Sequence, residues 1–159
     1  MALWTIAEQQ AIKPLDKNNT NKFGQLQLEV EANDIQKYLG FEFYQEVKRN
    51  LPSYSLLLEG GNYEKGGKTY TFSGLKTVCC FLLYARYVRS SYINDTFSGL
   101  VEHTGDGFQR ISKDEIKNQE ERYLEIAGTL WDECVDYLQT MQVPYFDKKT
   151  GRTFKIDSL

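Results

Sequence analysis

The sequence predicts a mainly α-helical protein, a compact helical bundle with a long C-terminal helix, one or two β-hairpin insertions and an extended C-terminal tail. Three observations favour this fold class. Apolar residues recur at spacings of three and four through most of the chain. Gly66-Gly67 divides two short runs rich in β-forming residues, and Ser112 opens a capping box before the longest periodic stretch. The 159 residues suffice for one domain with a real core.

We divide the chain into three parts by composition and pattern. Residues 1–21 are predicted to be an N-terminal arm, residues 22–141 a helical core domain, and residues 142–159 a tail. The core domain is expected to carry a hairpin at 62–72 and an irregular or hairpin loop at 94–110.

Three helices are predicted in the first third of the chain. A short helix over residues 6–12 begins after Thr5, a favourable N-cap. A longer one over residues 23–39 has its predicted buried face on apolar residues spaced by four, three and four: Leu28, Ala32, Ile35 and Leu39. Gly40 is expected to end this helix, and a further short helix covers residues 41–50.

A β-hairpin follows, because two glycines allow the positive φ values of a two-residue turn. Residues 63–65 and 68–72 would be its strands, with Tyr70 and Phe72 alternating with threonines to make one face aromatic. Such aromatic residues suit either a core or an interface, and their number in the hairpin favours an interface.

Two long helices complete the predicted core domain. The first, from Gly74 to about Tyr92 with Ser73 as N-cap, is apolar around most of its circumference, so we expect it at the centre of the fold. The second begins at the capping box of Ser112 and Glu115 and ends before Pro144.

The net charge of −3 argues against a general nucleic-acid binder, which needs a basic face to attract phosphates. The charge is uneven along the chain. Residues 100–141 hold 4 basic and 10 acidic residues, a net of −6, whereas residues 142–159 hold 4 and 2, a net of +2. The acidic stretch is either a solvated helix face or a surface that faces a basic partner or something that it must repel.

Composition also limits where the protein works. The longest strongly apolar run, from Val78 to Ala85, is far shorter than the roughly 20 residues that cross a bilayer, and no signal peptide is visible. The three cysteines, Cys79, Cys80 and Cys134, lie in predicted helices without a disulfide framework. We expect buried, reduced thiols and folding in a reducing cytoplasm.

Signatures of catalysis are nearly absent from the sequence. The chain has one histidine, His103, and lacks the glycine-rich phosphate-binding and nucleophile motifs. We therefore predict no catalytic residue, no cofactor and no metal site. A small enzyme that uses Cys79, His103 or Asp106 stays open as an alternative.

Four stretches carry a family resemblance: LEGGNYE at 58–64, YTFSGLK at 70–76, YARY at 84–87 and TFSGLV at 96–101. They resemble small structural proteins of Bacteroides phages, including crAss-like phages. The order of elements is similar to that of the head–tail connector (adaptor) proteins of tailed phages. The resemblance covers roughly residues 22–146.

The resemblance implies a virion protein that is assembled in the host cytoplasm and lies at the head–tail interface. Connector subunits form a ring, usually dodecameric, under the portal protein, and the ring extends the DNA channel. Its implied partners are further copies of the chain, the portal, and tail or further ring proteins. Double-stranded DNA would pass through without specific binding, and no membrane is involved.

The resemblance also assigns roles to residues. The residues expected to dock on the portal are Val143, Tyr145, Phe146, Phe154 and Ile156. The residues expected at subunit or partner interfaces are Tyr63, Tyr70, Phe72, Phe97 and Leu100. The acidic residues expected to face the channel are Glu120, Glu121 and Glu125. The alternative is a non-enzymatic host or phage interaction module that binds a partner through its aromatic hairpin and tail.

Overall fold

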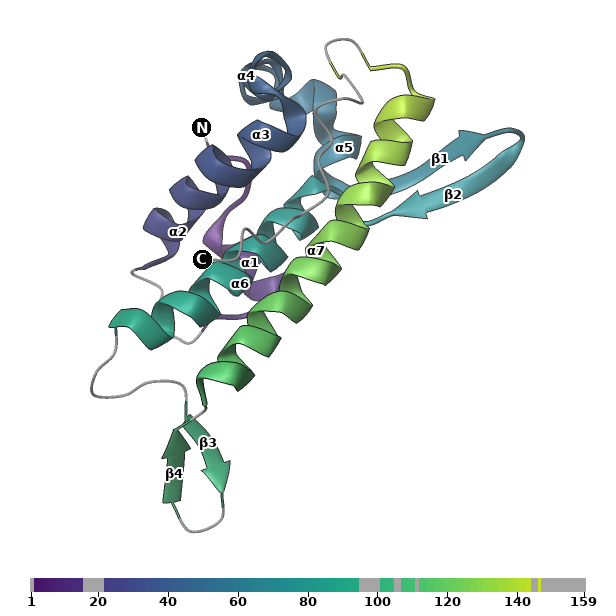
Figure 1. The fold of residues 1–159 in the computed structure, drawn as a ribbon. Helices are drawn as coiled ribbons and strands as arrows, with labels where there is room; N and C mark the ends of the chain where they lie inside the picture. The colour runs from purple at the N-terminus through teal and green to yellow at the C-terminus, as the bar shows by residue number, and fades with distance from the viewer. Residues whose placement is uncertain are drawn as a thin grey trace.

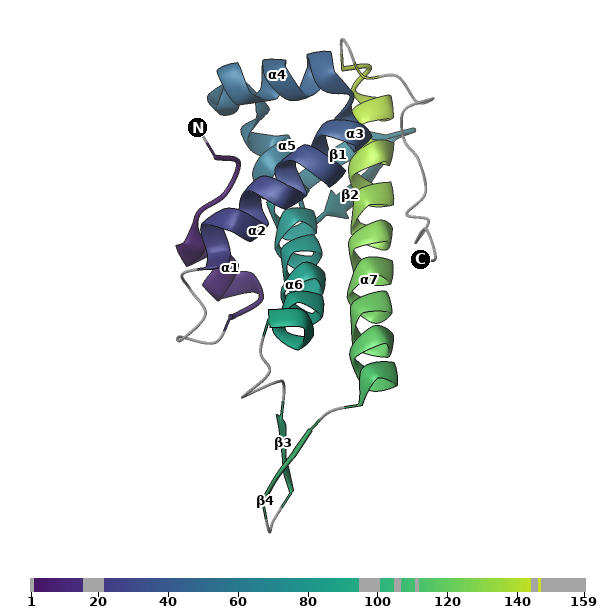
Figure 2. The ribbon, with the colours of Figure 1, turned by 60° about the vertical axis from the view of Figure 1, so that its left-hand side comes forward.

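A computed structural model describes residues 2–15, 22–94, 101–104, 107–110, 112–143 and 146, with the backbone alone for 91–94, 101–104 and 107–110. The fold is mainly helical and has a long C-terminal helix and hairpin insertions, as predicted. Two long helices, α6 (Leu75–Asn94) and α7 (Lys113–Thr140), run side by side, and α6 lies between α2 (Phe23–Val30) and α7 (Figures 1 and 2).

The N-terminal segment is packed into the core. Helix α1 (Ile6–Ile12) begins at the predicted N-cap, where Thr5 and Glu8 form a capping box. Before it, Leu3 and Trp4 are 2% and 1% exposed. The buried Gln9 side chain accepts a hydrogen bond from Trp4 Nε1 at 3.3 Å and donates one to the Cys80 carbonyl at 3.2 Å. Residues 2–15 therefore belong to the same core as α6.

The predicted helix over 23–39 is interrupted by a π-helical turn. Helix α2 continues into η2 (Glu31–Ile35), a π-helix, and then α3 (Gln36–Leu39). The buried apolar positions are Phe23, Leu26, Val30, Ile35 and Leu39, with a step of five residues across η2. The predicted inner face was wrong at Leu28, which is 69% exposed, and at Ala32, because the π turn inserts a residue and rotates α2 relative to α3.

A buried carboxylate holds this region together. Glu31 of η2, 4% exposed, accepts hydrogen bonds from the Leu3 N–H at 3.1 Å and the Tyr44 hydroxyl at 2.8 Å. It also pairs with Lys48 at 2.7 Å. Tyr44 and Lys48 lie on α4 (Phe41–Arg49), so one side chain joins the N-terminal segment, η2 and α4.

Two short helical turns and the first hairpin connect α4 to α6. The turns are η3 (Leu51–Tyr54) and α5 (Ser55–Glu59). Strands β1 (Gly61–Lys65) and β2 (Lys68–Phe72) pair antiparallel, with Tyr63 opposite Tyr70. The predicted turn is confirmed, because Gly66 and Gly67 have φ values of 59° and 75°.

A second antiparallel hairpin lies within the predicted loop over 94–110. It consists of β3 (Val101–Thr104) and β4 (Gly107–Arg110). Both hairpins project from the helical body, one beside the C-terminal half of α7 and one beyond its N-terminus (Figure 1).

The long helices differ slightly from their predicted bounds. Helix α6 begins at Leu75, and Gly74, with φ of 80°, precedes it in place of the predicted cap Ser73. The central position of α6 agrees with its sequence, because its side chains at Leu75, Val78, Cys79 and Leu83 are all 0% exposed. Helix α7 has the predicted capping box at Ser112 and Glu115 and spans 28 residues.

Candidate interaction surfaces

The outward face of α7 carries a line of carboxylates, which we call the acidic stripe: Asp114, Glu121, Glu125 and Asp132. Successive members are seven, four and seven residues apart, so with about 3.6 residues per turn they share one side of the helix. Asp114, Glu125 and Asp132 are exposed, and the Glu121 side chain is 40% exposed. The opposite side of α7 holds the buried residues Ala127, Trp131 and Cys134.

Only two of the three predicted channel residues belong to the acidic stripe. Glu121 and Glu125 are members, whereas Glu120 turns toward α6. The Glu120 side chain is 21% exposed and its carboxylate lies 3.5 Å from Arg89 Nη1. Asp114 and Asp132 were missed by the sequence analysis, although counting steps of seven and eleven residues from Glu121 along the same helix would have found both.

The aromatic face of the β1–β2 hairpin is mostly used inside the chain. Tyr63 and Phe72, both predicted at an interface, are 7% and 3% exposed. The Phe72 ring stacks on Tyr137 of α7 with centroids 4.5 Å apart. The third predicted residue, Tyr70, is 42% exposed and stacks on Tyr63 at 5.8 Å. Phe97 and Leu100, predicted at the same interface, lie outside the described residues.

Asp136 of α7 fixes the hairpin in place. Its carboxylate accepts a hydrogen bond from the Tyr63 hydroxyl at 2.6 Å and forms an ion pair with Lys65. Burial, followed by the bond to Asp136, raises the pKa of Tyr63 to about 12. The hydrogen bonds from Lys65 and Tyr63 lower the pKa of Asp136. The hairpin is therefore held to α7 by both stacking and polar contacts.

The first residues of the predicted docking tail pack on the chain itself. Val143 and Phe146 are partly buried against the core, and the Phe146 ring meets Phe43 of α4 edge-on at 6.0 Å. Tyr145, Phe154 and Ile156 lie outside the described residues. The described residues of the tail, Val143 and Phe146, therefore pack over the end of the bundle.

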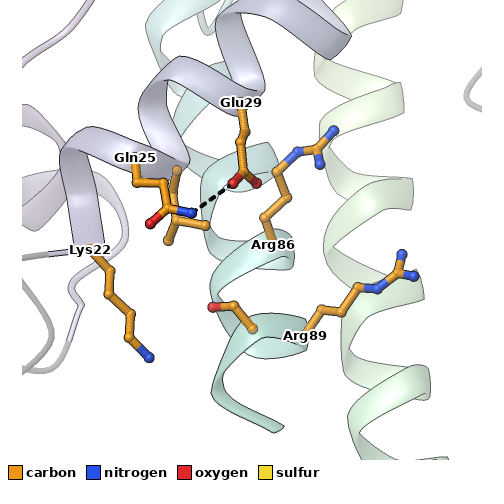
Figure 3. Close-up of a pocket in the computed structure, with 7 residues that line it drawn as sticks. Lys22, Gln25, Glu29, Arg86 and Arg89 are labelled. Carbon is orange, nitrogen blue, oxygen red and sulfur yellow. Dashed lines mark hydrogen bonds between the residues drawn. The ribbon is translucent and has the colours of Figure 1, made fainter. Parts of the chain in front are cut away.

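A hollow of about 250 Å³ lies between α2 and α6 (Figure 3). Its lining is charged and polar around one buried leucine: Lys22, Gln25, Leu26, Glu29, Arg86, Arg89 and Ser90. No short-range sequence pattern predicts it, because it joins residues 22–29 to residues 86–90 across the fold.

The cations around the hollow do not converge on one point. Arg86 donates two hydrogen bonds to Asp34, at 3.0 and 2.7 Å. The guanidinium groups of Arg86 and Arg89 extend in the same direction toward α7, away from Lys22 (Figure 3). The volume also falls below the roughly 300–1,000 Å³ of small-molecule pockets.

The residues that the enzyme alternative would use are Cys79, His103 and Asp106. Cys79, Cys80 and Cys134 are buried free thiols, as predicted. Burial raises the pKa of Cys79 well above its ordinary value and that of Cys80 to about 12, so neither is a ready thiolate. His103 lies on β3 opposite Phe108, and Asp106 is outside the described residues.

The described residues contain neither a metal-binding cluster nor a membrane-spanning helix. They contain no group of three or more His, Cys, Asp or Glu side chains placed to hold a metal ion. Within the same part of the chain, every helix is too short or too polar to span a bilayer.

Comparison with known proteins identifies the family. Residues 35–155 match the family model DUF6712, described as a family of unknown function, and the chain belongs to that family. No curated protein and no solved structure matches the chain.

Proposed function

We propose that this protein is a structural virion protein, a head–tail connector subunit. Copies of it form a ring, dodecameric in connectors of this kind, under the portal protein. The ring extends the DNA channel and links the capsid to the tail or to further ring proteins. The proposal is supported by the resemblance of four sequence stretches to phage structural proteins and, above all, by the acidic stripe on α7.

The acidic stripe suits a wall that DNA passes without binding. A basic wall would hold DNA by neutralising phosphates and releasing counterions, whereas carboxylates repel phosphates at short range. The stripe follows α7 from Asp114 to Asp132, about 27 Å at 1.5 Å per residue. Repeated around a ring, it would give a channel lined with negative charge along most of that length.

The C-terminal tail and the two hairpins, which lie outside the stripe, would make the partner contacts. The basic tail, with Tyr145, Phe154 and Ile156, would dock on the portal as an extended segment that adds to a sheet edge or groove. Val143 and Phe146 would anchor the base of this tail on the bundle. The hairpins would contact neighbouring subunits.

The test is a charge reversal of the stripe in assembled particles. The variant Glu121→Lys/Glu125→Lys/Asp132→Lys should still form rings, because these side chains point away from the core. It should retain DNA in a salt-dependent way and lower the yield of infectious particles at least tenfold. The control Glu42→Lys/Glu46→Lys changes an exposed and a partly exposed carboxylate on α4, away from the stripe and the hairpins, and should behave as wild type. Normal infectivity of the stripe variant, or a ring image with the stripe on the outer surface, would overturn the channel role.

An interaction module without a ring is the second candidate, and exposed Tyr70 favours it. Such a module would bind a partner through the hairpin and the tail and would not enter virions. Affinity capture with purified portal protein separates the two candidates, because only a connector should bind it. Binding that depends on residues 147–159 supports the connector.

A further inference from the structure

We propose that Tyr70 of one copy inserts into the hollow between α2 and α6 of the next copy. This inference rests on the proposed ring and names the contact that would join its subunits. The occupant of the hollow is thus a second copy of this chain.

Tyr70 has the features of an interface anchor. It is 42% exposed on a projecting hairpin, and one face of its ring stacks on the Tyr63 ring, with the centroids 5.8 Å apart. The hairpin is itself held to α7 by the Phe72–Tyr137 stack and by the Tyr63–Asp136 hydrogen bond. A side chain presented on a fixed support loses little freedom on binding, and tyrosine is enriched among residues that dominate binding energy.

The hollow offers matching chemistry. Its volume of about 250 Å³ suits one aromatic side chain, and Leu26, 4% exposed, supplies an apolar wall. The Arg89 side chain, 57% exposed, crosses the hollow on its way to Glu120, so its aliphatic part can pack on an inserted ring. Glu29, which accepts a hydrogen bond from Gln25 at 3.2 Å, has further acceptor capacity for a phenolic hydroxyl.

The positions of the two features favour a contact between copies. The hairpin joins the N-terminal end of α6, whereas Arg86, Arg89 and Ser90 lie toward its C-terminal end. Leu75 and Arg89 are separated by about 21 Å along the helix axis. The hairpin also points away from α2 (Figure 1). Tyr70 therefore cannot fill the hollow of its own chain. Two different patches that fit each other produce a head-to-tail interface, which closes into a ring when the rotation permits.

Engineered disulfides test the contact directly. In the full-length chain, Tyr70→Cys/Gln25→Cys places one thiol on the hairpin and one at the hollow, while the three native thiols are buried. Mild oxidation should give a ladder of covalently linked copies on a non-reducing gel. The control Thr71→Cys/Gln25→Cys moves the hairpin thiol to the opposite face of β2 and should give no ladder.

If the double cysteine variant assembles poorly, sedimentation of single variants measures self-association instead. We expect Tyr70→Ala to weaken self-association about 30-fold or more and Tyr70→Phe to weaken it less. Thr71→Ala should match wild type. If Tyr70→Ala assembles like wild type, this inference is wrong. It is also wrong if Tyr70→Cys/Gln25→Cys assembles but gives no covalent ladder. Neither result contradicts the proposed ring. A wild-type chain that stays monomeric at every concentration also overturns it, while portal binding and particle incorporation decide the proposed function separately.

Discussion

Gly60 and Gly74 lie backbone against backbone at the base of the β1–β2 hairpin. A Cβ atom on Gly60 would stand 2.5 Å from the Phe72 carbonyl oxygen and 2.7 Å from the Gly74 nitrogen. Both glycines have positive φ, 81° and 80°. This contact brings the end of α5 to the start of α6 and sets the angle at which the hairpin leaves the bundle.

Replacement of Gly60 should therefore be costly. Gly60→Ala combines backbone strain at positive φ with a clash against backbone atoms that cannot rotate away, and we expect a loss of about 3–5 kcal/mol in the free energy of unfolding. Gly66→Ala is the matched control, because Gly66 also has positive φ but nothing within 4 Å of an added Cβ. It should lose only about 1–2 kcal/mol. Urea unfolding measures both, and equal losses would contradict the proposed close contact.

The Tyr63–Asp136 bond predicts a loss of stability at alkaline pH. Folding raises the pKa of Tyr63 from 10.0 to about 12, so the fold favours the protonated phenol. This contribution is complete below about pH 10 and is lost as the pH rises from 10 to 12. Thermal unfolding across this range should show a smaller alkaline loss for Tyr63→Phe than for wild type.

A second variant separates the two causes of that shift. Asp136→Asn keeps a hydrogen-bond acceptor for Tyr63 but removes the negative charge, so the alkaline loss should start at the same pH and be smaller than in wild type. If Tyr63→Phe and wild type lose stability in parallel between pH 10 and 12, the bond does not contribute to the fold as described.

Glu31 should contribute more to stability than Glu29, the carboxylate two residues before it. Glu31→Gln removes the charge that Leu3, Tyr44 and Lys48 share, and the expected cost is about 2 kcal/mol of unfolding free energy. Glu29→Gln, two residues earlier and partly exposed, should change stability by less than about 0.5 kcal/mol. Denaturant unfolding measures the difference, and similar values for the two variants would show that the buried network is dispensable.

Local patterns predicted most of the helices because their signals are local. The N-cap at Thr5, the capping box at Ser112 and the Gly66-Gly67 turn depend on residues a few positions apart, and all three formed as predicted. The π turn at η2 could not be read the same way. A regular period of 3.6 residues correctly predicts that Ile35 and Leu39 are buried, but it also places Leu28 on the buried face. The spacing of apolar residues does not indicate that the π turn adds one residue.

The candidate surfaces were predictable only in part, because aromatic residues serve cores and interfaces equally well. Tyr63 and Phe72 are buried against α7, and only the tertiary contact with Tyr137 distinguishes them from exposed Tyr70. Glu120 and Glu121 are adjacent in sequence, yet a helix turns by about 100° per residue, so one pairs with Arg89 and the other faces outward.

We expect residues 143–146 to stabilise the fold and residues 147–159 to dock on the portal. Deletion of residues 147–159 leaves Val143 and Phe146 in place, so the free energy of unfolding should stay within about 0.5 kcal/mol of wild type. Deletion of 143–159 also removes the Phe43–Phe146 contact and should cost about 1–3 kcal/mol, although the capped helices before it still fold. Thermal unfolding followed by circular dichroism measures both.

Particle incorporation then distinguishes folding from docking. Both truncated chains should fail to enter virions, because both lack Phe154, Ile156 and the basic residues of the tail. Phe146→Ala in the full-length chain is the control: it should lose stability like the longer deletion yet still be incorporated, since its ring packs on Phe43. Incorporation of the chain that lacks 147–159 would show that the portal contact lies elsewhere. If Phe146→Ala fails to enter virions while the chain without residues 147–159 is incorporated, the residues that dock on the portal lie at the base of the tail.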